Sequence, residues 1–131
     1  QKILCLFLFN KNAISLLKSN IKNINWCNIC RNENAMNLIE DNKDKKDIDW
    51  MFLSEKSYAI NLLNKNKHKI FWCSLCVNEN AMELLEQNQD KINWEKLSQN
   101  PSIFTYDYTT IKQIKHDINK EFIEWMMETR T

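Results

Sequence analysis

Four tryptophans recur along the chain at nearly constant intervals, and this repetition limits the possible folds more than any other feature. They are Trp26, Trp50, Trp72 and Trp94, separated by 24, 22 and 22 residues. Alanines recur in the same order at Ala13, Ala35, Ala59 and Ala81. A fixed interval of about 20 to 50 residues is the signature of a repeat architecture, in which neighbouring units share one continuous core.

The repeated unit follows the pattern N-x-N-A-[IM]-x-L-[LI]-x-x-N-x-x-x-I-x-W-x-x-[LI]-[SC]. We divide the chain into a partial unit at 1–11, full units at 12–31, 32–55, 56–77 and 78–99, and a different C-terminal part at 100–131. The second full unit has two extra residues within Lys43–Asp47, a charged run typical of a turn. In the partial unit, Leu4, Phe7 and Asn10 replace Trp, Leu and Asn. We therefore expect the natural chain to continue upstream.

Each full unit is predicted to contain two short helices. In the last unit, Asn78 is the expected N-cap of the first helix, because its side chain can accept a hydrogen bond from a free backbone N–H. Pro101 follows the equivalent asparagine in the C-terminal part and suits the first helical position. Asn88 is expected to end the helix in the left-handed conformation common at helix C-caps. The segment Ile92–Leu97 favours a second helix of one or two turns over an extended segment.

Helices this short are unstable in isolation, so each must bury its apolar face against the next unit. The predicted fold is all-α: an α-solenoid of short helical hairpins in which alanines allow close approach and tryptophans fill the space between layers. After Tyr106 the pattern changes to a single helical stripe of apolar residues. Its members are Ile111, Ile114, Ile118, Phe122 and Trp125 or Met126. We expect them to form a longer helix that caps the stack.

The repeated strings resemble a known family. The strings A-M-E-L-L-E-Q-N at Ala81–Asn88 and D-K-I-N-W-E-K-L-S-Q-N-P-S-I-F at Asp90–Phe104 are similar to N-P-x-A-I-x-L-L-E-x-N-P-x-K-I-x-W-x-x-L-S repeats. Such repeats occur in proteins of large DNA viruses that infect algae and protists, proteins loosely grouped with ankyrin-repeat proteins. The resemblance covers nearly the whole chain, and Ile103–Tyr108 is similar to the way those arrays close.

The resemblance implies a viral origin and an interaction role, and it supplies no catalytic residues to carry over. It also implies an intracellular location in the host-cell cytoplasm and leaves the virion open. The chain departs from the family pattern at the proline of N-P, which is Lys11, Glu33 or Glu79 in three units. The segment Lys56–Tyr58 replaces that region in the remaining unit. These departures weaken the predicted helix caps but keep the interval.

The chain contains no glycine, which excludes several enzyme classes. Phosphate-binding loops need glycine so that the backbone can approach the ligand, so neither a P-loop nor a dinucleotide-binding fingerprint is present. The net charge of +1 indicates no basic surface for nucleic acid. The longest apolar run, Ile3–Phe9, is shorter than the about 20 residues of a membrane helix. We predict a protein that is not an enzyme, needs no cofactor, and binds neither nucleic acid nor a membrane.

Two Cys-x-x-Cys pairs are the most specific chemical motif: Cys27 with Cys30, and Cys73 with Cys76. Two such pairs can form a four-thiolate zinc site. Here the pairs stand two units apart, and layers spaced about 8–10 Å would separate them by roughly 20 Å, too far for one metal ion. Packing is the favoured interpretation, because Ser54 takes the place of Cys30 and Cys76. A metal site completed by another chain and a redox dithiol are the alternatives.

The remaining candidate groups fit a solvated surface better than a catalytic site. The histidines His68 and His116 lie beside lysines and have no third partner for a triad. Four glutamates are expected on exposed helix faces. They are Glu33, Glu40, Glu83 and Glu86. The tryptophans could stack on bases, but their apolar neighbours favour the core.

The predicted function is a scaffold for interaction with a protein partner, since repeat arrays present extended binding surfaces. Positions that vary between units would carry specificity. One set is Ser15, Asn37, Asn61 and Glu83, and the other is Asn28, Phe52, Ser74 and Lys96. A zinc-binding module and a nucleic-acid-binding helical repeat are the alternative functions.

Overall fold

The computed structural model describes residues 10, 12–104 and 108–129, and all regular structure within these ranges is helical. The first helices of the four units are α2 (Ile14–Ser19), α4 (Met36–Asp41), α6 (Ile60–Lys65) and α8 (Met82–Glu86). The second helices are α3 (Trp26–Ile29), α5 (Trp50–Glu55), α7 (Trp72–Leu75) and α9 (Trp94–Leu97). Each second helix begins at one of the recurring tryptophans, so the prediction of a helix rather than an extended segment is confirmed.

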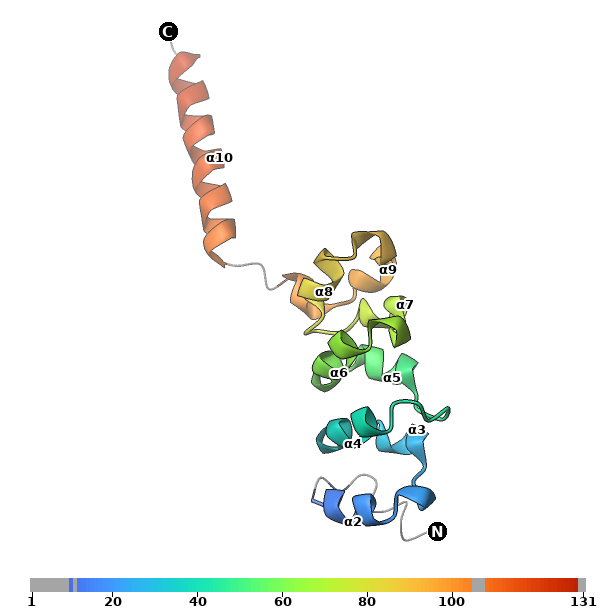
Figure 1. Ribbon diagram of the computed structural model, residues 1–131. Helices are drawn as coiled ribbons and strands as arrows, with labels where there is room; N and C mark the ends of the chain where they lie inside the picture. Colours follow the sequence, from blue (N-terminus) through green and yellow to red (C-terminus); the bar gives the residue numbers. More distant parts are fainter. Residues whose placement is uncertain (1–9, 11, 105–107, 130–131) are drawn as a thin grey trace.

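Short 3₁₀ helices complete the units. Three of them connect the two helices of a unit: η1 (Ile21–Asn23), η4 (Lys67–Lys69) and η5 (Gln89–Lys91). Two others, η2 (Glu33–Ala35) and η3 (Ser57–Ala59), lead into α4 and α6, and η6 (Pro101–Phe104) begins with the proline expected at a first helical position. In Figure 1, α2, α4, α6 and α8 succeed one another along one side of the structure, and α3, α5, α7 and α9 along the other.

A hydrophobic core runs through all four units. Each first helix from α4 onward buries two adjacent branched residues, such as Leu62 and Leu63, and the second helices bury one, such as Leu53. Ala35, Ala59 and Ala81 are completely buried. Burial of this apolar surface is the main stabilising contribution, because helices of four to six residues do not persist alone.

The recurring tryptophans differ in burial according to their place along the chain. Trp26 and Trp50 are 6% and 8% exposed, Trp72 is half-buried, and Trp94 is 67% exposed. The amino group of Lys69 lies over the Trp50 ring, 5.2 Å from its centroid, and that of Lys91 lies 4.4 Å from the centre of the Trp72 ring. The core role predicted for the tryptophans is therefore correct for the first two and wrong for Trp94, which no following unit covers.

A buried asparagine joins each of several units to the unit before it. The Nδ2 atom of Asn78 donates to the carbonyl oxygens of Ser54 and Lys56, both at 2.9 Å. Its Oδ1 atom accepts from the backbone N–H of Asn80 at 3.0 Å. The predicted bond from a free backbone N–H to the Asn78 side chain is present, but Asn78 is not the N-cap of α8, which begins at Met82 with Ala81 as its N-cap. The same side chain also bonds the backbone of earlier units.

Asn32 and Asn100 occupy the same position in other units, and we call Asn32, Asn78 and Asn100 the ladder asparagines. All three are at most 2% exposed. Asn100 donates to the carbonyl oxygens of Cys76 and Asn78, which lie in two earlier units, both at 2.9 Å. Asn32 donates to the carbonyl of Asn10 at 3.1 Å. In the remaining unit Lys56 replaces the ladder asparagine, and the hydroxyl of Tyr58 donates to the Cys30 carbonyl at 2.9 Å. Tyr58 thereby replaces one of the missing donors.

A second set of asparagines lies at the C-terminal ends of the first helices, as the C-cap of α2, α4 and α6 and one residue after the C-cap of α8. In Asn20, Asn42, Asn66 and Asn88, Nδ2 donates to the carbonyl oxygen four residues earlier, at 2.8–2.9 Å. The predicted left-handed conformation is wrong: Asn88 has φ of −136°, and no described residue has a positive φ. The carboxamide satisfies a terminal carbonyl that a left-handed cap would otherwise satisfy through the backbone.

The predicted C-terminal helix is present as α10, Tyr108–Glu128. Its side chains from 116 to 129 are all exposed, so this part of the helix makes no capping contact with the last unit. Phe122 and Trp125 stack on each other with ring centroids 6.1 Å apart. Among the described residues, no helix combines the length and the apolar composition needed to cross a membrane.

Candidate functional site

Each Cys-x-x-Cys pair spans one short helix and divides between solvent and core: Cys27 and Cys73 are the second residues of α3 and α7, and Cys30 and Cys76 are their C-caps. Cys27 and Cys73 are exposed, and Cys30 and Cys76 are completely buried. In α3 the core-facing residues are Trp26 and Ile29, which are three apart and share one face of the helix, so Cys27 lies on the exposed side. Cys30 is the C-cap of α3, where the backbone of Asp49 lies against its thiol. Cys30 and Cys76 are buried as a packing role requires, whereas Cys27 and Cys73 are not.

The buried thiols belong to the contacts between units. The Sγ atom of Cys76 donates to the carbonyl of Trp72 at 3.2 Å and accepts from the backbone N–H of Asn93, in the following unit, at 3.3 Å. In the equivalent position, Ser54 Oγ donates to the Trp50 carbonyl at 2.7 Å and accepts from the N–H of Phe71 at 3.1 Å. Serine and cysteine thus fill one structural position, in which a small side chain links two layers.

Burial controls the chemistry of these thiols. Desolvation raises the pKa of the Cys30 thiol from 9.0 to about 11, although a hydrogen bond from the backbone N–H of Asp49 opposes the shift. Desolvation also raises the pKa of Cys76. Since the thiolate is the form that attacks electrophiles and binds metal ions, both residues are poor nucleophiles and poor ligands at neutral pH.

Among the described residues, neither cysteine pair belongs to a metal-binding cluster. Within the described ranges, no three His, Cys, Asp or Glu side chains are placed to hold a metal ion. His68 lies in η4 and His116 in α10, and both are exposed. A zinc site within one chain would have to use groups beyond the part that the structure describes, and Cys5 lies outside that part.

We expect the thiols to differ sharply in reactivity. In the native protein, iodoacetamide should alkylate Cys27 and Cys73 rapidly, whereas Cys30 and Cys76 should react only after unfolding, because burial limits both access and ionisation. Peptide mass spectrometry after timed labelling measures each site separately. Labelling in denaturant is the control, and rapid native labelling of Cys30 or Cys76 would contradict the structure.

Stability should also depend on pH through Cys30. Because the folded pKa is raised, the folded protein keeps the thiol proton in a range where the unfolded chain has lost it, so stability falls as pH rises from about 9 towards 11. Comparison of urea midpoints under reducing conditions at about pH 8 and about pH 10.5 should show a smaller decrease for Cys30→Ser than for wild type. The urea midpoint of Cys27→Ser, which removes an exposed thiol, should decrease by as much as that of wild type. Equal decreases of the midpoint in all three proteins would refute the effect.

The carboxylates singled out in the sequence form no acid–base pair. Glu33, Glu83 and Glu86 are exposed, and Glu40 is half-buried. Glu40 forms an ion pair with Lys65 of the next unit, with 2.9 Å between Oε1 and Nζ. This pair is exposed and serves as a surface contact between α4 and α6.

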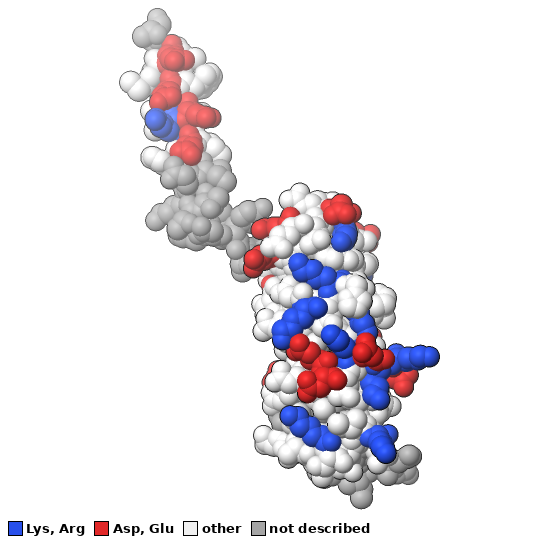
Figure 2. Space-filling model, in the orientation of Figure 1, with Lys and Arg blue, Asp and Glu red and all other residues white. Residues whose placement is uncertain are grey.

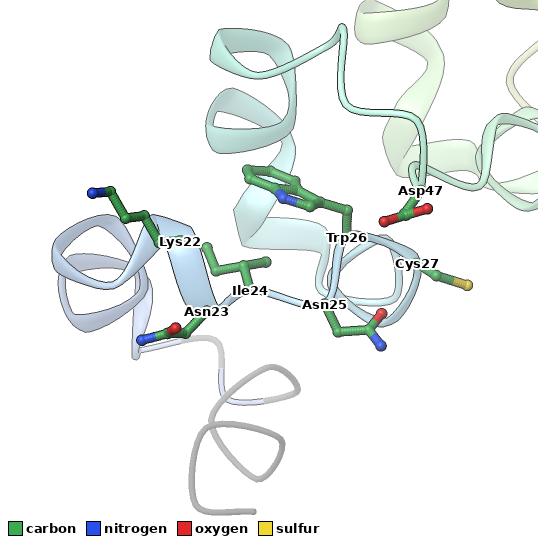
Figure 3. Close-up of a pocket in the computed structure, with 7 residues that line it drawn as sticks. All are labelled: Lys22, Asn23, Ile24, Asn25, Trp26, Cys27 and Asp47. Carbon is green, nitrogen blue, oxygen red and sulfur yellow. The ribbon is translucent and has the colours of Figure 1, made fainter. Parts of the chain in front are cut away.

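A surface hollow near the N-terminal end offers no convergent chemistry either. Lys22, Asn23, Ile24, Asn25, Trp26, Cys27 and Asp47 line it. Figure 3 shows their side chains pointing in different directions rather than towards a common point, with the Cys27 side chain directed away from Trp26. A catalytic site needs functional groups within hydrogen-bonding reach of one substrate position, and this arrangement lacks them.

Two grooves between neighbouring first helices are the strongest candidate for a binding surface. The groove between α4 and α6 has a volume of about 880 Å³, and the groove between α6 and α8 about 460 Å³. Asn61 and Asn64 of α6 line both grooves, so the two form one surface. Asn37 lines the first groove and Glu83 the second. Three of the four variable positions predicted on the first helices therefore lie in this surface, which we call the groove surface.

The charges on the face shown in Figure 2 are mixed in sign. Figure 2 shows Lys and Arg interspersed with Asp and Glu over the visible face of the units, without a large patch of one sign. The groove surface itself combines Lys65 and Lys67 with Glu33, Glu40 and Glu83. Binding to a phosphate backbone depends on clustered cations, which this pattern does not provide.

Comparison of the chain with known protein families, with curated proteins and with solved structures finds no match.

Proposed function

We propose that the chain is a non-enzymatic scaffold, an α-solenoid of four two-helix units whose groove surface binds a protein partner. The observation that carries this proposal is the pair of adjacent grooves joined at Asn61 and Asn64. A surface of this kind grows with each added unit, which is how repeat arrays bind long ligands. The inter-unit bonds of the ladder asparagines support the solenoid, because each holds one layer at a fixed place on the next.

The groove surface is favoured over the surface of the second helices. Of the variable positions on the second helices, Phe52 is half-buried, and both Arg31 and Lys56 contact its ring. The guanidinium carbon of Arg31 is 5.4 Å from the ring centroid, and the amino group of Lys56 is 4.6 Å from it. The Phe52 ring is therefore already in contact with side chains of this protein, whereas Asn37, Asn61 and Glu83 are exposed.

The capping role of α10 remains a prediction. The last unit leaves Trp94 67% exposed, and Ser98 is exposed although Ser54 and Cys76 are buried in the same position. On α10, Phe122 and Trp125 are 56% and 59% exposed. Two uncovered apolar surfaces of one chain would gain stability by covering each other. Zinc binding and nucleic-acid binding gain no support from the thiol environments or from the charge pattern.

Display of a protein-fragment library tests the scaffold function. Fragments selected on the wild-type protein should bind Asn61→Arg at least about tenfold more weakly, because a bulky charge at the junction of the grooves blocks both. Met51→Arg is the matched control, since Met51 is 53% exposed on α5, outside the groove surface. The control should retain wild-type affinity. Selection of no fragment, or of fragments that bind both variants equally, would count against the proposal.

A further inference from the structure

The groove surface repeats itself from one unit to the next. Asn37, Asn61 and Glu83 each stand two residues after a buried alanine, and they line the grooves from α4, α6 and α8 respectively. Asn34, Tyr58 and Asn80 each stand one residue before that alanine, and these also line the grooves. A ligand that crosses both grooves therefore meets equivalent positions once per unit.

The exposed carboxamides of this surface are available to a ligand. Asn37, Asn61, Asn64 and Gln87 are exposed, and their side chains make no hydrogen bond within the part of the chain that the structure describes. Each carboxamide carries two N–H donors and a carbonyl acceptor, so it can pair with a peptide group of another chain. The buried asparagines differ, since their Nδ2 atoms already bond carbonyls of this protein.

Apolar atoms lie between these carboxamides. Leu62 and Leu84 form the floors of the two grooves and are 3% and 4% exposed. Met36 and Ile60 are half-buried and line one wall of each groove. Each groove thus offers a small apolar contact beside unpaired carboxamides, a combination that suits a side chain together with the backbone next to it.

The spacing of the helices selects the conformation of the ligand. Packed helices lie about 8–10 Å apart, so equivalent grooves recur at about that interval. Three residues of polyproline II span about 9.3 Å, and its threefold symmetry returns every third side chain to the same face. Three residues of a β-strand span about 10 Å, but its side chains alternate between the two faces, so two residues that are three apart point in opposite directions. Polyproline II is the extended conformation that matches both length and direction.

We propose that the groove surface binds an extended peptide in the polyproline II conformation, with every third side chain entering a groove and the carboxamides donating to the peptide carbonyls. The inference rests on the proposed scaffold function and narrows it to one class of partner. The backbone of polyproline II has no internal hydrogen bonds, so its carbonyls are free to accept from Asn61 and Asn64. An amphipathic helix would require a wide hydrophobic groove, whereas these grooves have polar rims.

Labelled synthetic peptides test the inference by fluorescence anisotropy. The probe is four Pro-Pro-Leu triplets, and its control has the same composition in an order that breaks the three-residue interval. The ordered probe should bind at least about tenfold more tightly than the control. The double variant Asn61→Ala/Asn64→Ala should weaken its binding about tenfold through two lost hydrogen bonds, and Asn28→Ala on α3 should not. All variants should first show the wild-type unfolding midpoint.

The outcomes separate this inference from the scaffold function. Equal affinity for the ordered and scrambled probes, or unchanged binding by the double variant, overturns the polyproline II inference. If library fragments still depend on Asn61, the scaffold function stands and its partner has another conformation. Library fragments that depend on Asn61 and carry an apolar residue at every third position would support the inference independently.

Discussion

Asn78→Leu is expected to lower the free energy of unfolding by about 4 kcal/mol, because leucine fills the space but forms no hydrogen bond. The change leaves the carbonyls of Ser54 and Lys56 and the N–H of Asn80 without their Asn78 partners. A buried polar group that loses its partner costs about 1–3 kcal/mol, so three such losses account for the expected total. Urea unfolding followed by circular dichroism measures it.

The matched control is Asn61→Leu on the exposed face of α6, where the carboxamide has no partner among the described residues. This substitution should change the free energy of unfolding by less than about 0.5 kcal/mol, as is usual at surface positions. Similar effects of the two substitutions would show that Asn78 does not join two units. A large effect of Asn78→Leu alone would place the inter-unit bonds among the main determinants of stability.

The core could be predicted from the sequence because its residues follow a simple rule. Apolar side chains at helical spacing must be buried together, so the positions of Leu53, Leu63 and Ala59 within the repeat are enough to indicate their burial. The helical second half of each unit follows from the same reasoning.

The roles of the asparagines could not be predicted in the same way. An asparagine near a helix end can accept from a nearby N–H or donate to a distant carbonyl, and the sequence pattern is identical in both cases. Asn78 does both, because it accepts from Asn80 within its own unit and donates to Ser54 in an earlier unit. The departure from the repeat pattern at Lys56–Tyr58 is informative. Where the bridging asparagine is missing, another residue has to supply a donor, and here it is the Tyr58 hydroxyl.

Alignment of the repeat units could have predicted which cysteine of each pair is exposed and which is buried, although the Cys-x-x-Cys motif alone could not. Cys27 aligns with Met51 and Glu95, both exposed, whereas Cys30 aligns with the buried Ser54. Alignment of the units therefore separates an outward from an inward thiol in each pair. The grooves have no such signal, because they depend on the distance between layers and on the direction of side chains such as Asn61 and Asn64.

Trp50→Ala is expected to lower the free energy of unfolding by about 4 kcal/mol, whereas Trp94→Ala should lower it by less than about 1 kcal/mol. The two residues begin equivalent helices, α5 and α9, but Trp50 is 8% exposed and Trp94 is 67% exposed. Removal of the buried ring leaves a cavity and also removes the contact between the ring and the amino group of Lys69. Removal of the exposed ring leaves no cavity.

The contrast between these variants tests whether stacking of units, rather than the local sequence of a unit, creates the core. Both substitutions remove the same side chain from the first position of a short helix, so their effects on helix propensity are nearly equal. Any large difference in the urea midpoint must then come from the unit that covers Trp50 and is missing over Trp94. Equal losses of stability would mean that Trp94 is buried in solution, as it would be if α10 covered the last unit. A fragment ending before α10 would then restore the difference, because it removes the segment that provides this cover.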